Sequence, residues 1–270
     1  MSLTAAVLLG IIQGLTEFLP VSSSAHLILA RAFFGWEIPE AVELPFDVAL
    51  HVGTLVAILA FFRVDILAMV RAVPRIFAAT PDPSARLIRL IAIGTIPVVI
   101  VGLAFKDFIE DVLRTPAVAA GALAVGAVLM LVAERVGSQK TDERAIGPGG
   151  AFLIGCAQAS ALIPGMSRSG STISMGMFLG LRREAAARFT FLLSIPAMIA
   201  AAAKEGLDMM TVPLPDGSAL LIAVGAIVSA VVGYLTIKYF LRFLGSNRLD
   251  VFAGYRLILA AATVIWIVTR

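Results

Sequence analysis

Long apolar runs, separated by short polar segments, dominate the chain. A helix that crosses the hydrocarbon core of a bilayer needs about 20 predominantly apolar residues. We therefore expect an all-α integral membrane protein. Runs of this length predict six transmembrane helices, at residues 47–63, 88–105, 117–134, 187–203, 218–240 and 250–269.

Two further apolar stretches, 5–30 and 151–181, are each interrupted near the middle. Pro20 and the serines after it break the first stretch, and Pro164 with Gly165 breaks the second. Each half of these stretches is too short to span a bilayer. The pattern predicts two re-entrant helical hairpins, because irregular backbone at membrane depth is tolerated only where it lines a cavity or is buried in protein.

The two halves of the chain resemble each other. Residues 90–103 and 221–234 are identical at seven of 14 aligned positions, and Gln13 aligns with Gln158 ahead of the two breaks. Each half therefore holds one hairpin and three crossings. Because three is odd, the second half enters the membrane from the opposite side. Such an inverted-topology repeat brings its hairpins together near the membrane midplane. The prediction is a single membrane domain over 1–270, with repeats at 1–135 and 150–270.

Composition supports a membrane protein. Of the 270 residues, 60% are hydrophobic and 14% charged, against about 25% charged in soluble domains. The predicted loops on one side, including 64–87, hold 14 Lys and Arg residues, and those on the other side hold five. Basic loops face the cytoplasm, so both termini should face outward. The basic residues fit a membrane surface, and we expect no nucleic-acid partner.

Ionisable side chains inside the membrane are costly and usually functional. Glu17 follows Gln13 by four residues, so both share one helix face. His26 lies three residues after Ser23 and faces the same space if that turn is helical. The second break supplies Arg168. The two breaks also supply hydroxyl side chains, at Ser22, Ser23, Ser167, Ser169 and Thr172.

These residues suit a phosphate site. Helix N-termini bind anions through free N–H groups and the helix dipole, and one short helix begins after each break. Arg168 adds a planar fork for two phosphate oxygens. Glu17 and His26 can supply the base, acid or metal ligand that phosphoryl transfer requires.

Several polar residues also have structural interpretations. Glu17 and Arg168 could form a buried ion pair without a catalytic role. Arg256 lies about six residues into its segment, and the sequence leaves open whether it reaches the membrane surface or the site. Three others are interpreted as structural: His51 as a satisfied polar side chain, Asp47 as a helix N-cap and Cys156 as a packing residue.

The breaks carry motifs that resemble those of the undecaprenyl-diphosphate phosphatase family, the bacitracin-resistance proteins. The family pattern (E/Q)-x-x-x-E, followed by F-L-P-(V/I)-S-S-(S/T)-(A/G)-H, matches residues 13–26. The pattern P-G-x-S-R-S-G-(A/S)-T matches 164–172, and F-x-F-L-L-(S/A)-(I/V)-P matches 189–196. The resemblance runs from about residue 5 to 270. Gln13 departs from the Glu found in many members, which weakens its case as a charged base or metal ligand.

The resemblance implies hydrolysis of undecaprenyl diphosphate to the monophosphate and inorganic phosphate in the bacterial plasma membrane. This activity recycles the lipid carrier for peptidoglycan and cell-wall synthesis, and it blunts bacitracin, which binds the diphosphate. The family is described as dependent on Mg²⁺ or Ca²⁺, for which Glu17 is the expected ligand. Polyprenyl diphosphate and membrane lipids are the expected partners. Gly-rich runs such as 121–126 could pack helices within one subunit or between subunits, so a homodimer is possible.

Residues and resemblance together give a mechanistic hypothesis. Ser23 is the nucleophile, His26 and Glu17 activate it, and Arg168 holds the phosphate. A water nucleophile and a phosphohistidine at His26 are alternatives. The site should open outward. Substrate binding is assigned to Gln13, Ser22, Ser167, Ser169, Thr172 and Arg256.

Two rival functions can be weighed against the pattern. Inverted repeats with broken helices are typical of transporters, so the same phosphate site could serve a flippase for the lipid carrier. An unrelated class of membrane lipid phosphatase carries P-S-G-H and K-x6-R-P motifs, and neither occurs here.

Overall fold

The computed structural model describes residues 2–36, 40–78, 82–209, 215 and 217–269. Its regular elements over these residues are all helices, which confirms the all-α class. Six helices are long and apolar enough to cross a membrane, as predicted. They are α3 (Glu40–Phe61), α5 (Pro83–Ala104), α7 (Pro116–Val136), α10 (Arg183–Met209), α11 (Ser218–Leu244) and α12 (Asp250–Val268).

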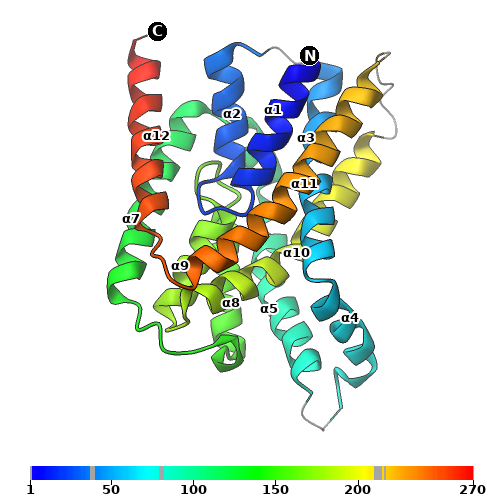
Figure 1. Ribbon diagram of the computed structural model, residues 1–270, viewed down its shortest axis with the longest axis vertical. Helices are drawn as coiled ribbons and strands as arrows, with labels where there is room; N and C mark the ends of the chain where they lie inside the picture. The colour runs from blue at the N-terminus through cyan, green and yellow to red at the C-terminus, as the bar shows by residue number, and fades with distance from the viewer. Residues whose placement is uncertain (1, 37–39, 79–81, 210–214, 216, 270) are drawn as a thin grey trace.

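Two pairs of short helices occupy the interrupted stretches. α1 (Leu3–Thr16) and α2 (Ser23–Phe34) flank the first break, and α8 (Pro148–Ser160) and α9 (Arg168–Phe178) flank the second. α1 descends from the upper end of the molecule to its middle, where the chain turns back into α2 (Figure 1). The start of α1 and the end of α12 also lie at the upper end. Both interruptions are therefore where the sequence predicted them.

Some predicted boundaries were wrong. The segment 64–87 was expected to be a loop, but it contains α4 (Arg63–Ala72) and the short helix η1 (Val73–Arg75). Residues 63–72 include neither Gly nor Pro, so nothing prevents a helix there. α4 lies at the lower end of the molecule, beside the start of α5 (Figure 1). Short helices also form at α6 (Lys106–Asp111) and η2 (Glu143–Ala145).

α5 begins five residues before the predicted position 88, because Asp82 caps it. The Asp82 carboxylate accepts hydrogen bonds from the backbone N–H groups of Ser84 and Ala85, at 2.9 and 3.0 Å. These N–H groups and the Arg75 side chain hold the pKa of Asp82 below its usual value. Pro83 occupies the first helical position, where its missing N–H costs nothing.

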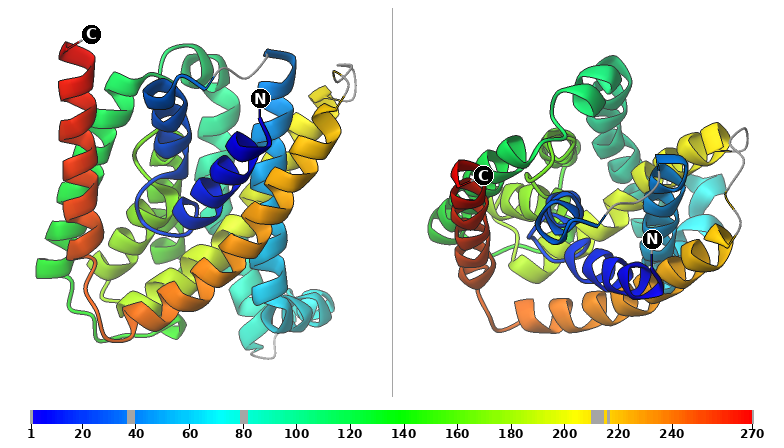
Figure 2. Two further views of the ribbon diagram at one scale, coloured as in Figure 1. Left: turned by 45° about the horizontal axis from the view of Figure 1, so that its top comes forward. Right: turned by 90° about the horizontal axis from the view of Figure 1, so that it is seen from above.

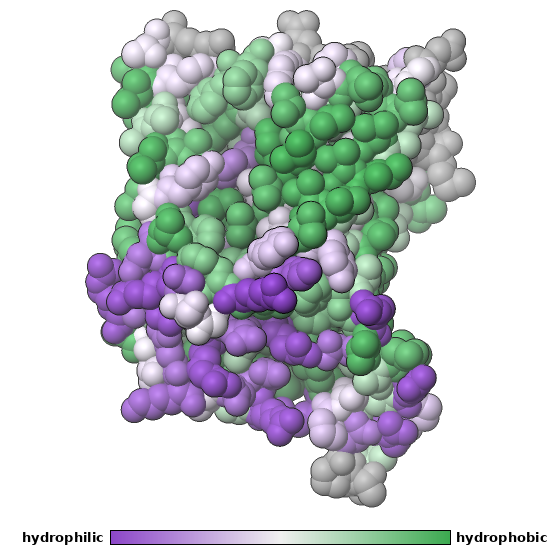
Figure 3. Space-filling model, viewed as in Figure 1, coloured by the Kyte–Doolittle hydropathy of each residue, from purple (hydrophilic) through white to green (hydrophobic). Residues whose placement is uncertain are grey.

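Polar and apolar surface separate along the molecule. Hydrophilic residues gather over the lower part, and apolar residues cover much of the upper part (Figure 3). The lower end carries α4 and the start of α5 (Figure 2), which belong to the side with the larger predicted basic charge. The cytoplasmic assignment of that side stays a prediction.

Two close helix contacts occur at aligned positions of the predicted repeats. A Cβ atom on Gly10 of α1 would lie 2.8 Å from the carbonyl oxygen of Gly225 in α11, and one on Gly155 of α8 would collide with Gly94 of α5. Gly10 aligns with Gly155, and Gly94 aligns with Gly225. A repeat predicts that the same helix contact occurs once in each half, and the two contacts agree with this. Its inverted symmetry stays a prediction.

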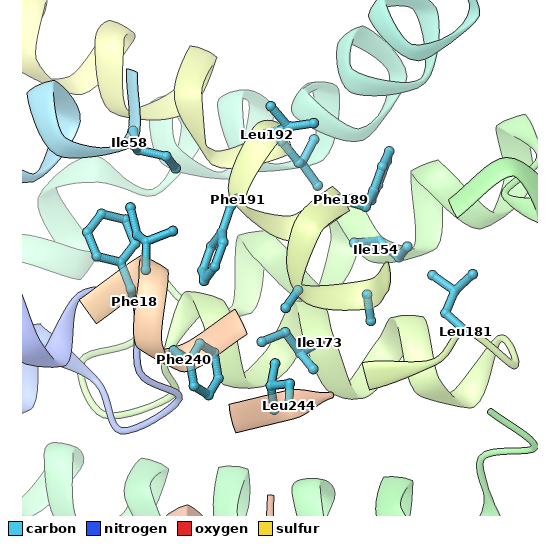
Figure 4. Packing of buried hydrophobic residues seen from close by; sticks show 14 of the residues in the cluster. Phe18, Ile58, Ile154, Ile173, Leu181, Phe189, Phe191, Leu192, Phe240 and Leu244 are labelled. Atoms are coloured by element: carbon cyan, nitrogen blue, oxygen red, sulfur yellow. The ribbon is translucent and has the colours of Figure 1, made fainter. Parts of the chain in front are cut away.

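Buried aromatic side chains anchor the first break to the core. Phe18, in the break itself, is 1% exposed and packs edge-on against Phe191 of α10, with ring centroids 5.6 Å apart. Figure 4 shows both side chains in the cluster that also includes Ile58 and Phe240. Burial of Phe18 fixes the chain immediately after Glu17.

The Gly155 contact gives a test of the packing. Substitution of Gly155 by Ala should destabilise the protein by about 1–3 kcal/mol, because the added methyl group meets the backbone of α5. Thermal unfolding in detergent would measure the loss. Gly121→Ala in α7 is the control, since nothing lies within 4 Å of the added atom. Equal melting temperatures for the two variants would contradict the close contact.

Candidate active site

The structure brings the two breaks together. The backbone N–H of Gly165 donates to Ser22 Oγ at 3.1 Å, and Ser169 Oγ donates to the carbonyl oxygen of Leu19 at 2.9 Å. These bonds join residues more than 140 positions apart in the chain. Side chains from both hairpins can therefore act on one ligand.

The two breaks also share an unusual backbone conformation. Ser22 has φ 74° and ψ 99°, and Ser167 has φ 68° and ψ 114°. These serines align in the predicted repeat, and each immediately precedes a short helix. A non-glycine residue in such a conformation costs about 1–3 kcal/mol and persists only where its surroundings fix it. Ser167 Oγ accepts a bond from Gly170 N at 3.1 Å, which holds the start of α9.

Glu17 is the centre of the polar network. Its carboxylate accepts hydrogen bonds from Gln13 Nε2 at 3.0 Å and from Ser23 Oγ at 2.5 Å. Arg168, from the second break, forms an ion pair with the other oxygen of Glu17. The Glu17 side chain is 7% exposed and that of Arg168 is 19%. Base, nucleophile and cation candidates are therefore in direct contact.

A cavity of about 280 Å³ opens beside this network. Five of the predicted site residues line it: Glu17, Ser22, Ser23, Ser167 and Arg168. Its other walls are mainly apolar and come largely from α3 and α10. The remaining five predicted residues, Gln13, His26, Ser169, Thr172 and Arg256, are not among its lining.

His26 faces α12 rather than the cavity. Its Nδ1 lies 2.7 Å from the carbonyl oxygen of Ser22, and its Nε2 lies 2.7 Å from the hydroxyl of Tyr255. A carbonyl only accepts, so Nδ1 carries the proton and Nε2 of the neutral ring accepts from Tyr255. Both ring nitrogens are thus occupied. These contacts favour a role in holding the strained Ser22, and with it Ser23, over direct proton transfer.

His51 and Asp47 were given only structural interpretations, yet both line the cavity. His51 Nδ1 lies 2.8 Å from the carbonyl oxygen of Asp47, and its Nε2 lies 4.0 Å from Glu17 Oε2. Asp47 is not an N-cap, because α3 already begins at Glu40; it pairs with Arg31 instead. The sequence held one signal for this: two ionisable residues four positions apart in an apolar helix lie on the same helix face.

Gln158 is a further cavity residue that the sequence showed only as the counterpart of Gln13. It is 1% exposed, and neither polar atom of its amide has a hydrogen-bond partner in the part of the chain that the structure describes. An unsatisfied buried polar group costs about 1–3 kcal/mol. The amide is therefore available to a ligand in the cavity.

Arg256 is fully buried and holds the two breaks in place. Its guanidinium donates to the carbonyl oxygens of Pro20 at 3.3 Å, Gly165 at 2.8 Å and Met166 at 3.1 Å. It also donates to carbonyls of α7. A side chain at Gly126 would overlap the guanidinium. These contacts favour a structural role. Arg256 was predicted to bind substrate, but it does not line the cavity.

Three other predicted roles look different in the structure. Ser169 bonds to Leu19 and Thr172 Oγ1 donates to the carbonyl oxygen of Arg168 at 2.6 Å, so both shape the backbone around the site. Cys156 is exposed on α8, and the prediction that it packs in the core was wrong. An apolar run in a membrane helix has a lipid-facing side as well as a core side.

Comparison with known proteins identifies the family. The family model described as "Bacitracin resistance protein BacA" matches residues 6–262. The chain belongs to the BacA family of bacitracin resistance proteins. A BacA relative from Rubrobacter xylanophilus is 46% identical over 264 residues, which cover 97% of both chains. Relatives from Chlorobium luteolum and Alcanivorax borkumensis are 44% and 43% identical, with 97% or more of both chains covered. All three are named undecaprenyl-diphosphatase.

A divalent ion would have few protein ligands in this BacA site. No group of three or more His, Cys, Asp or Glu side chains that could hold a metal occurs among the described residues. Mg²⁺, however, is often held by one or two carboxylates together with substrate phosphates and water. Among the described residues, only Arg168 donates a hydrogen bond to Glu17 Oε1, which leaves one lone pair for an ion. The site fits an ion that is shared with the substrate.

The contacts of Arg256 predict a large effect on stability. Arg256→Gln should destabilise the protein by at least about 3 kcal/mol, because it leaves several buried carbonyls without donors. Thermal unfolding of the detergent-solubilised protein would show this. Arg242→Gln, an exposed arginine at the end of α11, is the matched control and should change stability by less than about 0.5 kcal/mol. Equal stability of the two variants would refute the structural role.

Proposed function

We propose that the protein is a membrane phosphatase that hydrolyses undecaprenyl diphosphate to undecaprenyl phosphate and inorganic phosphate. Its BacA membership and the names of its relatives support this activity. The observation that carries the proposal is the direct contact of Ser23 and Arg168 with Glu17, in a cavity formed where two broken helices meet. The monophosphate then returns to the carrier cycle of cell-wall synthesis.

In the enzyme without substrate, the Glu17 carboxylate forms an ion pair with the guanidinium of Arg168. An incoming phosphoryl group offers Arg168 a better partner, since guanidinium binds phosphate oxygens in a bidentate manner. Transfer of Arg168 to the phosphate frees an oxygen of Glu17. The short bond from Ser23 Oγ to Glu17 then supplies a path for the serine proton.

The first chemical step forms a bond between Ser23 Oγ and the terminal phosphorus. The bond from that phosphorus to the bridging oxygen breaks, and its electron pair leaves with undecaprenyl phosphate. The serine proton passes to Glu17. Arg168 and the N–H groups at the start of α9 stabilise charge on the phosphoryl oxygens.

The second step releases inorganic phosphate. Once Glu17 has returned its proton to solvent, it accepts a proton from water, whose oxygen attacks the phosphoserine. The serine oxygen leaves and takes the proton that Glu17 has just accepted from water, which restores both groups. Direct attack by water on the diphosphate is the alternative. A phosphohistidine at His26 is disfavoured, because both of its ring nitrogens are hydrogen-bonded and it does not line the cavity.

We further propose that Glu17 would hold Mg²⁺ or Ca²⁺, which would neutralise negative charge on the diphosphate. The bacterial plasma membrane and an outward-facing site remain part of the proposal. The basic character of the opposite end supports that orientation. A flippase is not favoured, since transport requires no serine in contact with a buried carboxylate.

Loss of either charge at the centre should abolish turnover. Glu17→Gln and Arg168→Gln should each lower phosphate release from polyprenyl diphosphate by at least about 10³-fold, because base and phosphate clamp are both lost. Glu184→Gln and Arg242→Gln are matched controls at exposed positions. Release by either site variant at the control rate would sink the proposed site.

The serine mechanism predicts a covalent intermediate. Acid quenching of wild-type enzyme with substrate labelled in the terminal phosphate should trap label on Ser23, and Ser23→Ala should trap none and turn over at least about 10³-fold more slowly. Ser160→Ala, at the end of α8, is the control. Near wild-type turnover by Ser23→Ala would replace the serine with a water nucleophile.

A further inference from the structure

The active-site cavity adjoins a second, outer hollow. The outer cavity has a volume of about 490 Å³. It lies against α2, α3 and the segment that leads into α7. Four residues line both cavities: Ser24, Asp47, His51 and Arg114. Arg114 therefore stands at the junction between the inner and outer spaces.

The charged residues around these cavities are paired, with one exception. Arg168 pairs with Glu17, and Arg31 pairs with Asp47 and with Glu43. Arg114 has no hydrogen bond or ion pair with any residue whose side chain the structure describes. Arg114 is exposed, and none of the described residues accepts a hydrogen bond from its five N–H donors.

The proposed reaction supplies a ligand of matching chemistry. The substrate carries two phosphoryl groups, and the group that reacts with Ser23 must lie against Arg168. In-line displacement places the leaving oxygen on the far side of the phosphorus from the nucleophile. The lipid-linked phosphate therefore points away from Ser23, and negative charge develops on it as the bond breaks. A cationic side chain at that position would stabilise this charge.

We propose that Arg114 forms a second phosphate subsite, which binds the lipid-linked phosphate of the substrate and stabilises it as the leaving group. This inference rests on the proposed phosphatase function. It makes Arg114 the residue that distinguishes diphosphates from single phosphates. A ligand with one phosphate fills only the Arg168 subsite, and a ligand with two phosphates fills both.

The test compares two inhibitors of phosphate release from polyprenyl diphosphate. Inorganic phosphate has one phosphoryl group, and methylenediphosphonate has two joined by a carbon that the enzyme cannot cleave. In Arg114→Gln, the inhibition constant of methylenediphosphonate should rise about tenfold or more, because a charge-assisted pair is lost. That of inorganic phosphate should change less than about twofold. Arg114→Lys should recover part of the affinity as a point charge.

Lys204→Gln is the control for long-range electrostatics. Lys204 is an exposed cation just beyond the α10 wall of the inner cavity and does not line it. It should leave both inhibition constants unchanged. If Arg114→Gln weakens both inhibitors equally, Arg114 acts through its field alone and the subsite is refuted. No change for methylenediphosphonate in Arg114→Gln also refutes it.

Calorimetric binding separates this inference from the proposed function. Methylenediphosphonate binding to the detergent-solubilised protein requires no turnover. A wild-type protein that binds it and loses affinity on Arg114→Gln, yet releases no phosphate, would keep the subsite and refute the phosphatase. A wild type that releases phosphate but binds both probes independently of Arg114 would keep the phosphatase and refute the subsite.

Discussion

Backbone carbonyls at membrane depth need donors, and the two interrupted helices leave several without any. The structure satisfies them with one guanidinium. Arg256, fully buried in α12, bonds to carbonyls of Pro20, Gly165 and Met166 and to α7 behind them. Neither break could persist in lipid without such a partner. The cavity, the strained serines and the polar network all depend on this arrangement, because each is built on the backbone that Arg256 holds.

The ion pair between Glu17 and Arg168 is better understood as chemistry than as stability. Removing two charges from water costs several kcal/mol per ion, and attraction often only balances that cost. The same pair keeps a phosphate clamp and a base next to each other until substrate separates them. Strain at Ser22 and Ser167 has a similar meaning, since these two cavity-lining serines begin α2 and α9 in an unfavourable backbone conformation, at the expense of local stability.

The sequence predicted the six crossings and both breaks, because apolar length and interruption are one-dimensional properties. The convergence of Glu17, Ser23 and Arg168 followed from the repeat. The hydrogen-bond partners of individual side chains could not be predicted from the apolar pattern or from the repeat. Tyr255, 229 residues from His26, turns that ring from the cavity. The early start of α3 was also hidden, because its charged first turns looked like a loop. Asp47 was therefore predicted to cap the start of this helix, whereas it lies inside the helix.

The position of the clamp in the chain has a consequence for biosynthesis. Pro20 belongs to a hairpin that is synthesised before α12, and α12 carries the arginine that donates to the Pro20 carbonyl oxygen. The carbonyl oxygen of Pro20 therefore lacks its Arg256 donor until α12 is in place. A chain without α12 would hold Glu17, Ser23 and Arg168 but not the guanidinium that fixes the backbone around them.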